Sequence, residues 1–219
     1  MDGVRVSRLL IWSGPVFAVL FAVLAVASGD APGVNKSPAE INKYFDDHSG
    51  MLLASVFLSP LAIALLIGFT AAVRTRASES GRSAVGPAIM MAGAVVWSAG
   101  LLLGSMITLA QVDASDDKHI EATHALNDLS GASWVPLIAG IAVFLIGAGI
   151  TALASRLLPA WLGWLALALG VVSLAGPGGF VGFFGAPLWL LVGGTLLGLR
   201  DRGAVTEPLT QPVTERAAV

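Results

Sequence analysis

The chain has 219 residues, of which 56% are hydrophobic and only 12% are charged, and its mean hydropathy is +0.83. Soluble domains are nearer to a quarter charged, so this composition indicates one integral membrane domain. The formal net charge of −2 lacks the basic balance that would favour nucleic acid as a partner. Because cysteine is absent, disulfides, thiolate nucleophiles and iron–sulfur clusters are excluded.

Six apolar runs follow one another along the chain, and none of them contains Asp, Glu, Lys, Arg or His. A membrane-crossing helix needs about 20 apolar residues, because the hydrocarbon core is about 30 Å thick. We therefore predict an all-α, polytopic bundle of six hairpin-connected transmembrane helices over residues 1–203, followed by a disordered cytoplasmic tail over 204–219. The runs are Leu9–Ser28, Met51–Val73, Val85–Ala110, Ala132–Ala154, Pro159–Ala175 and Phe180–Leu199.

Two of these runs fit a second interpretation. Basic residues before the first run and Ala25-Val26-Ala27 near its end resemble a secretory signal peptide. The apolar stretch is longer than the usual ~7–15 residues, which favours an uncleaved helix. The fifth run is the shortest, and a tight loop (Gly176-Pro177-Gly178-Gly179) joins it to the sixth. A re-entrant hairpin is therefore the alternative to two full crossings.

The basic residues separate by type across the predicted membrane. Arginine marks cytoplasmic loops, so both termini are expected in the cytoplasm of a bacterium, with the chain in its cytoplasmic membrane. All lysines lie on the other side, at Lys36, Lys43 and Lys118. The arginines are Arg5, Arg8, Arg74, Arg76, Arg82, Arg156, Arg200, Arg202 and Arg216.

Two long acidic loops then face outward, Gly29–Gly50 and Gln111–Gly131, and each is expected to contain a short amphipathic helix. In the first, Ser37-Pro38-Ala39-Glu40 is a capping box with proline at the first helical position. In the second, Ser115 is expected to cap a helix that begins with Asp116-Asp117-Lys118.

Short motifs recur at a constant offset. Asp47-His48-Ser49-Gly50 matches Asp128-Leu129-Ser130-Gly131, and Gly68-Phe69-Thr70-Ala71 matches Gly149-Ile150-Thr151-Ala152. This pattern predicts a parallel internal repeat in which Asp47 and Asp128 cap equivalent helices. A chance likeness among abundant small residues is the alternative.

The outer histidines and acids are the candidates for chemistry. Glu121, His124 and Asp128 have the spacing of one helix face, and His48 precedes a neighbouring apolar helix. Carboxylate and imidazole groups suit zinc or another divalent ion, or general acid–base catalysis on the outer face. No recognised metal motif is present and acidic loops are usually only solvated, so we predict no cofactor and no catalytic residue.

Prolines and tryptophans interrupt the apolar runs. Pro15, Pro60 and Pro187 mark either ordinary kinks or a transport site built on broken helices. Trp97 and Trp189 fall near mid-membrane, where they either pack in the core or line a lipophilic pocket. Their indole N–H groups are expected to find a nearby serine hydroxyl or a carbonyl freed by Pro187. Close helix packing within the chain is expected at Gly100/Gly104, Gly178/Gly182 and Gly194/Gly198.

Three segments carry a family resemblance: Ser37-Pro38-Ala39-Glu40-Ile41 with Tyr44-Phe45 and His48, then Leu158-Pro159-Ala160-Trp161-Leu162-Gly163-Trp164, and the Pro187-Leu188-Trp189 helix ending at Arg200. With them, the layout resembles a family of actinobacterial six-helix integral membrane proteins known only as a domain of unknown function. The resemblance implies the six-helix fold over nearly the whole chain before the tail. It implies no reaction and no catalytic residues.

These observations favour a non-enzymatic membrane protein: a scaffold, an accessory subunit, or a binder of a lipophilic or small ligand. The expected partners are the lipid bilayer and a membrane protein or second copy, without nucleic acid. Two alternatives stay open, a small permease that is not proton-coupled and a membrane-embedded enzyme or metal site on the outer face.

Overall fold

The computed structural model describes residues 3–27, 32–33, 35–79, 81 and 84–203, and the predicted tail over 204–219 lies outside them. The described residues form six α-helices and one 3₁₀ turn, and they contain no strand. This confirms the all-α fold class. The elements are α1 (Gly3–Ala27), α2 (Pro38–Glu79), α3 (Val85–Asp116), α4 (Ile120–Ser155), α5 (Ala160–Ser173), η1 (Gly176–Gly178) and α6 (Gly179–Gly203).

Five of these helices are long and apolar enough to cross a membrane, so the chain is a polytopic membrane protein. The exception is α5, whose 14 residues rise only about 21 Å at about 1.5 Å per residue. That length is shorter than the ~30 Å hydrocarbon core. By contrast, α2 with 42 residues is about 63 Å long and must project beyond the bilayer.

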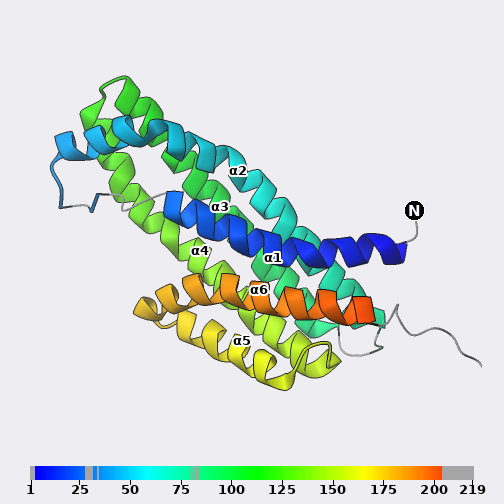
Figure 1. Cartoon of the computed structure of the whole chain (residues 1–219). Helices are drawn as coiled ribbons and strands as arrows, with labels where there is room; N and C mark the ends of the chain where they lie inside the picture. Colours follow the sequence, from blue (N-terminus) through cyan, green and yellow to red (C-terminus); the bar gives the residue numbers. More distant parts are fainter. Residues whose placement is uncertain (1–2, 28–31, 34, 80, 82–83, 204–219) are drawn as a thin grey trace, which may run out of the picture.

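Successive helices run in opposite directions (Figure 1). In this view α2, α3 and α4 follow one diagonal, and α1 and α6 lie across them closer to the horizontal. The contacts between elements form a ring, because α1 packs on α2 and α6, α3 packs on α2 and α4, and α4 also contacts α6. The short α5 packs against α4 and α6. In the most apolar 18-residue stretch of α4, 61% of the residues are buried, against 33% to 44% in the other four spans. Of these five helices, α4 is therefore the most enclosed.

Two expected outer helices form as continuous extensions of α2 and α4 rather than as separate elements. The capping box at the start of α2 is confirmed. The Glu40 backbone donates to the Ser37 hydroxyl at 3.3 Å, and the Ser37 backbone donates to the Glu40 carboxylate at 3.1 Å. That backbone bond lowers the pKa of Glu40, with smaller contributions from the Ser37 hydroxyl and the charge of Lys36.

Three other predicted caps are wrong. Ser115 lies in the last turn of α3, because that helix continues to Asp116 beyond its apolar run, and α4 begins at Ile120 without a side-chain cap. Asp47 and Asp128 lie inside α2 and α4, more than two turns from the first residue of each helix. The two helices do begin within one residue of each other at the offset of the repeat, and the repeat itself stays a prediction.

Glycines spaced by seven residues bring α3 and α4 into backbone contact. An added Cβ would lie 2.1 Å from a backbone nitrogen of the facing helix at Gly93, Gly140 and Gly147. At Gly86 and Gly100 it would lie 2.8 and 2.7 Å from the facing backbone. A seven-residue period keeps one seam in register along an antiparallel pair. Only a residue without a Cβ fits between the two backbones at this distance. The glycines therefore determine how closely α3 and α4 approach each other.

The glycines of α6 make similar contacts with α1. An added Cβ at Gly194 would lie 2.5 Å from the Pro15 ring, and one at Gly198 would lie 2.7 Å from the Trp12 ring. These contacts confirm that the Gly194/Gly198 pair packs inside the chain. They place the ring of Pro15 in a helix contact.

Candidate functional site

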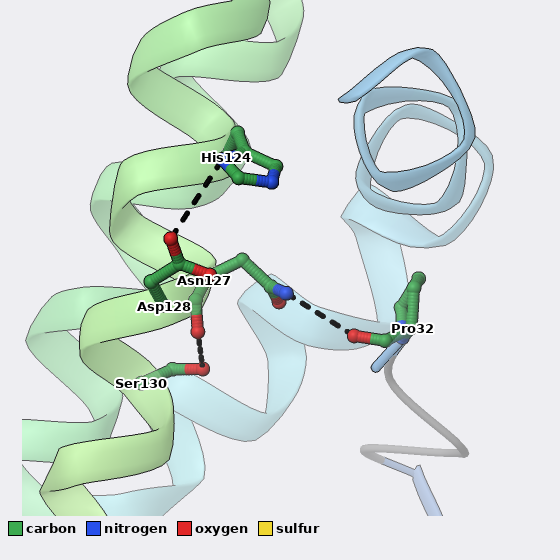
Figure 2. Close-up of polar contacts among 5 residues, drawn as sticks. All are labelled: Pro32, His124, Asn127, Asp128 and Ser130. Atoms are coloured by element: carbon green, nitrogen blue, oxygen red, sulfur yellow. Dashed lines mark hydrogen bonds and ion pairs between the residues drawn. The ribbon is translucent and has the colours of Figure 1, made fainter. Parts of the chain in front are cut away.

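The predicted outer cluster is only partly assembled. His124 Nδ1 lies 3.7 Å from an Asp128 carboxylate oxygen one turn along α4 (Figure 2). His48 on α2 stacks on the Tyr44 ring at 4.5 Å, and its Nδ1 lies 2.9 Å from the Tyr44 carbonyl oxygen. Glu121 is exposed. Among the described residues, no three His, Asp or Glu side chains converge to hold a metal ion.

Beside this cluster, buried polar side chains connect α4 to its neighbours. Thr123, which is fully buried, donates to the Asn42 side chain of α2 at 3.2 Å. Asn127 donates to the Pro32 carbonyl at 3.1 Å, which ties the segment after α1 to α4 (Figure 2). The Ser130 hydroxyl donates to the Asn127 carbonyl at 2.7 Å. These bonds fix the relative positions of three segments at the histidine-bearing end of the bundle.

Ser130 also lines a cavity of about 510 Å³ between α1, α2, α3, α4 and α6. None of the described residues that line it is charged. Apolar residues form part of the wall, including Phe21, Trp134 and Leu137. The rest of the wall carries hydroxyl groups from three helices: Ser55, Ser59, Ser105, Thr108, Ser130 and Ser133.

The cavity begins where the close contact between α3 and α4 ends. Gly100 still faces the backbone of Leu137, with 2.7 Å to an added Cβ. One turn further along α3, a Cβ added at Gly104 would meet no described atom within 4 Å. Pro136, which sequence reasoning did not single out, lies at this level of α4, and proline is a common cause of helix bending. The two helices are thus in contact at Gly100 and apart at Gly104, one turn further along α3.

A second, apolar groove of about 810 Å³ adjoins this cavity. The groove and the cavity share five lining residues: Phe21, Ala25, Val26, Phe183 and Phe184. The remaining wall comes mostly from α1 and α6. Val23 and Leu188 in this wall are 53% and 62% exposed, so the groove opens on the outer surface of the helix bundle.

The two mid-membrane tryptophans pack in the core and line neither cavity. Trp189 donates its indole N–H to the Leu162 carbonyl of α5 at 2.9 Å, so the predicted serine or proline-freed carbonyl is wrong. Trp97 is fully buried against aromatic edges from Phe17 and Phe144, and its indole N–H has no partner among the described residues. The core interpretation is the correct one.

Sequence reasoning missed the cavity, although it had a signal. The hydroxyls of Ser55, Ser59, Ser105 and Thr108 all fall in the half of their apolar runs nearest the acidic loops. Antiparallel packing places such residues at the same level of a bundle. No protein-family model, curated protein or solved structure matches the chain, so the resemblance to an actinobacterial family stays a prediction.

Proposed function

We propose that this protein binds one amphiphilic, lipid-like molecule from the membrane and is not an enzyme. The observation that carries the proposal is the hydroxyl-lined cavity adjoining an apolar groove open at the bundle surface. Polar groups that face an apolar environment need partners, whereas an apolar groove suits acyl chains. A molecule with a small polar head and a long apolar tail satisfies both spaces at once.

We further propose that both termini lie in the cytoplasm of a bacterium. This orientation is supported by the positive-inside rule, because the arginines with described side chains all lie near the helix ends on one side of the bundle. They are Arg74, Arg76, Arg156 and Arg200. Arg200 donates to the Leu157 carbonyl at 2.8 Å, which ties the end of α6 to the connection between α4 and α5. With this topology the cavity lies in the outer half of the bilayer, and its ligand comes from the outer leaflet.

Binding is favoured over passage through the bundle. Between the cavity and the arginine-bearing end, α3 and α4 touch backbone to backbone at Gly93, Gly140 and Gly147. A permease would have to separate this seam. Acid–base catalysis needs a titratable group at the reacting atoms, and the described part of the cavity wall has none. A role with a membrane-protein partner or a second copy is a separate proposal, tested by the mass of the purified complex.

The test fills the cavity without disturbing the packing. In Gly104→Leu, the new side chain enters the cavity, since no described atom lies within 4 Å of its Cβ. Gly131→Leu is the matched control, because Gly131 is exposed in α4 and its Cβ also meets no described atom. The probe is radiolabelled 1-monooleoylglycerol, titrated onto detergent-purified protein.

Wild type and Gly131→Leu are expected to bind about one probe molecule per chain saturably. Gly104→Leu should lose at least about tenfold in affinity, which is about 1.4 kcal/mol. Unsaturable partitioning into wild type, or equal binding by Gly104→Leu, would overturn the proposed function.

A further inference from the structure

The serine hydroxyls of the cavity have already used their hydrogens. A hydroxyl has one hydrogen to donate and two lone pairs that accept. Ser55, Ser130 and Ser133 each donate to the carbonyl three residues earlier in their own helix, at 2.7 Å. What these three side chains have left for a ligand is therefore acceptor capacity.

A relay of two hydrogen bonds between α3 and α2 likewise leaves acceptor capacity for a ligand. Ser105 donates to the Ser59 hydroxyl oxygen at 2.9 Å, and Ser59 donates to the Ser55 carbonyl at 3.0 Å. Both hydrogens are thus used inside the protein. The Ser105 oxygen is the first member of the relay, so both of its lone pairs remain for a ligand.

Three prolines place further acceptors at this level. Pro60, Pro136 and Pro187 have no N–H, so the carbonyl four residues before each of them lacks its helical donor. Each of these carbonyls belongs to a residue that lines the cavity or directly follows or precedes one. One of them is Phe183, which lines both the cavity and the groove.

Among the described lining hydroxyls, only that of Thr108 keeps a hydrogen that no described group accepts, so the wall offers more acceptors than donors. From this excess of acceptors we infer that the ligand carries an uncharged, hydroxylated head group that donates hydrogen bonds to the cavity. This inference rests on the proposed function and specifies its ligand class. A phosphate or carboxylate head would find the Thr108 hydroxyl as a donor but would otherwise face the lone pairs of the five serines. An ammonium head would be buried without an opposite charge from the described wall, because none of the described lining residues is charged. The apolar tail of the same molecule occupies the groove between α1 and α6.

Three probes with the same oleoyl chain test the inference on the full-length protein. The first is 1-monooleoylglycerol, the second is its dimethyl ether, which cannot donate, and the third is the anionic oleoylglycerol phosphate. Ser105→Ala and Ser133→Ala each remove one acceptor from the cavity. Ser78→Ala is the matched control, since Ser78 also donates to its own helix, at 3.0 Å, but is exposed near the end of α2.

Wild type and Ser78→Ala are expected to bind monooleoylglycerol about tenfold more tightly than either other probe, as two typical hydrogen bonds would give. In Ser105→Ala and Ser133→Ala this preference should fall to about threefold, with affinity for the dimethyl ether unchanged. Equal binding of the ether, or tighter binding of the phosphate, overturns the head-group inference and leaves the proposed function standing. If no probe binds wild type saturably, both are overturned.

Discussion

Gly93→Ala should disrupt the tightest contact in the bundle with a single methyl group. The new Cβ would lie 2.1 Å from the backbone nitrogen of Phe144 and 2.5 Å from its Cα. An ordinary contact begins at 3.4 Å, so α3 and α4 would have to separate by about 1.3 Å at this point. Backbone atoms cannot rotate away as a flexible side chain does. The whole seam must therefore open.

The loss follows from that displacement. Overpacking a tight core typically costs about 1–3 kcal/mol, and a radial gap of about 0.5–1 Å already forfeits a quarter to a half of each dispersion contact. Because Gly140 and Gly147 lie in the same seam, their contacts weaken together with that of Gly93. We expect Gly93→Ala to lower the free energy of unfolding by about 3 kcal/mol or more.

The same substitution about three turns further along α3, at Gly104, should change the stability in the opposite direction. Gly104→Ala adds its methyl group to open space, and alanine favours a helix over glycine by about 0.5–1 kcal/mol. The measurement is equilibrium unfolding in mixed micelles, followed by far-ultraviolet circular dichroism. Indistinguishable midpoints for Gly93→Ala and Gly104→Ala would refute the inferred backbone contact between α3 and α4.

Three further predictions concern topology, the core and the capping box. A reporter fused after Arg202 should be active only in the cytoplasm, and periplasmic activity would reverse the proposed orientation. Trp189→Phe should destabilise by about 1 kcal/mol more than Trp97→Phe, because only Trp189 loses a hydrogen bond, and equal unfolding midpoints would contradict this. Since the folded-state pKa of Glu40 is lowered below 4.5, its stabilisation should be complete above that pH and lost as pH falls through the folded value. Thermal midpoints across this range should fall less steeply in Ser37→Ala, and parallel pH profiles would argue against the cap.

Features that depend on neighbouring residues could be predicted from the sequence. The spans follow from apolar length, because the bilayer imposes a thickness that the chain must match. The capping box formed as expected because Ser37 and Glu40 are three residues apart and need no distant partner. The seven-residue spacing of Gly86, Gly93 and Gly100 was also visible, and it would have identified the α3–α4 seam.

Features that depend on tertiary contacts could not be predicted in this way. Gly50 and Gly131 suggested helix starts, yet both lie inside continuous helices. Distant bonds hold those extensions together, such as Thr123 to Asn42 across α4 and α2. The cavity is a space between five helices, so no single run encodes it. His48 and His124 belong to two loops on the same predicted side of the membrane, but His48 stacks on Tyr44 of its own helix. Among the described residues, no three His, Asp or Glu side chains come together at a metal site.

The placement of titratable groups predicts that ligand binding is not coupled to proton movement. Ionisable groups inside a bilayer are expensive, and a proton-coupled site needs one at depth. Among the described residues, every buried polar side chain belongs to Ser, Thr, Asn or Gln. The carboxylate paired with His124 belongs to Asp128, whose side chain is 53% exposed in the extension of α4. Hydroxyls and amides do not titrate near neutral pH, so no described side chain of the cavity wall can exchange a proton with the ligand.

Proteoliposomes with an internal pH dye provide the test. Adding 1-monooleoylglycerol across a pH gradient should give the same dye signal with the protein as in empty vesicles. Asp128→Asn should bind the probe as wild type does, since that carboxylate lines neither the cavity nor the groove. Protein-dependent proton movement that Asp128→Asn abolishes would show that the outer carboxylate communicates with the cavity. The loss of the hydroxyl pair in Ser105→Ala would then be expected to change the proton signal as well, because the Ser105–Ser59 bond links α3 to α2 in the cavity wall.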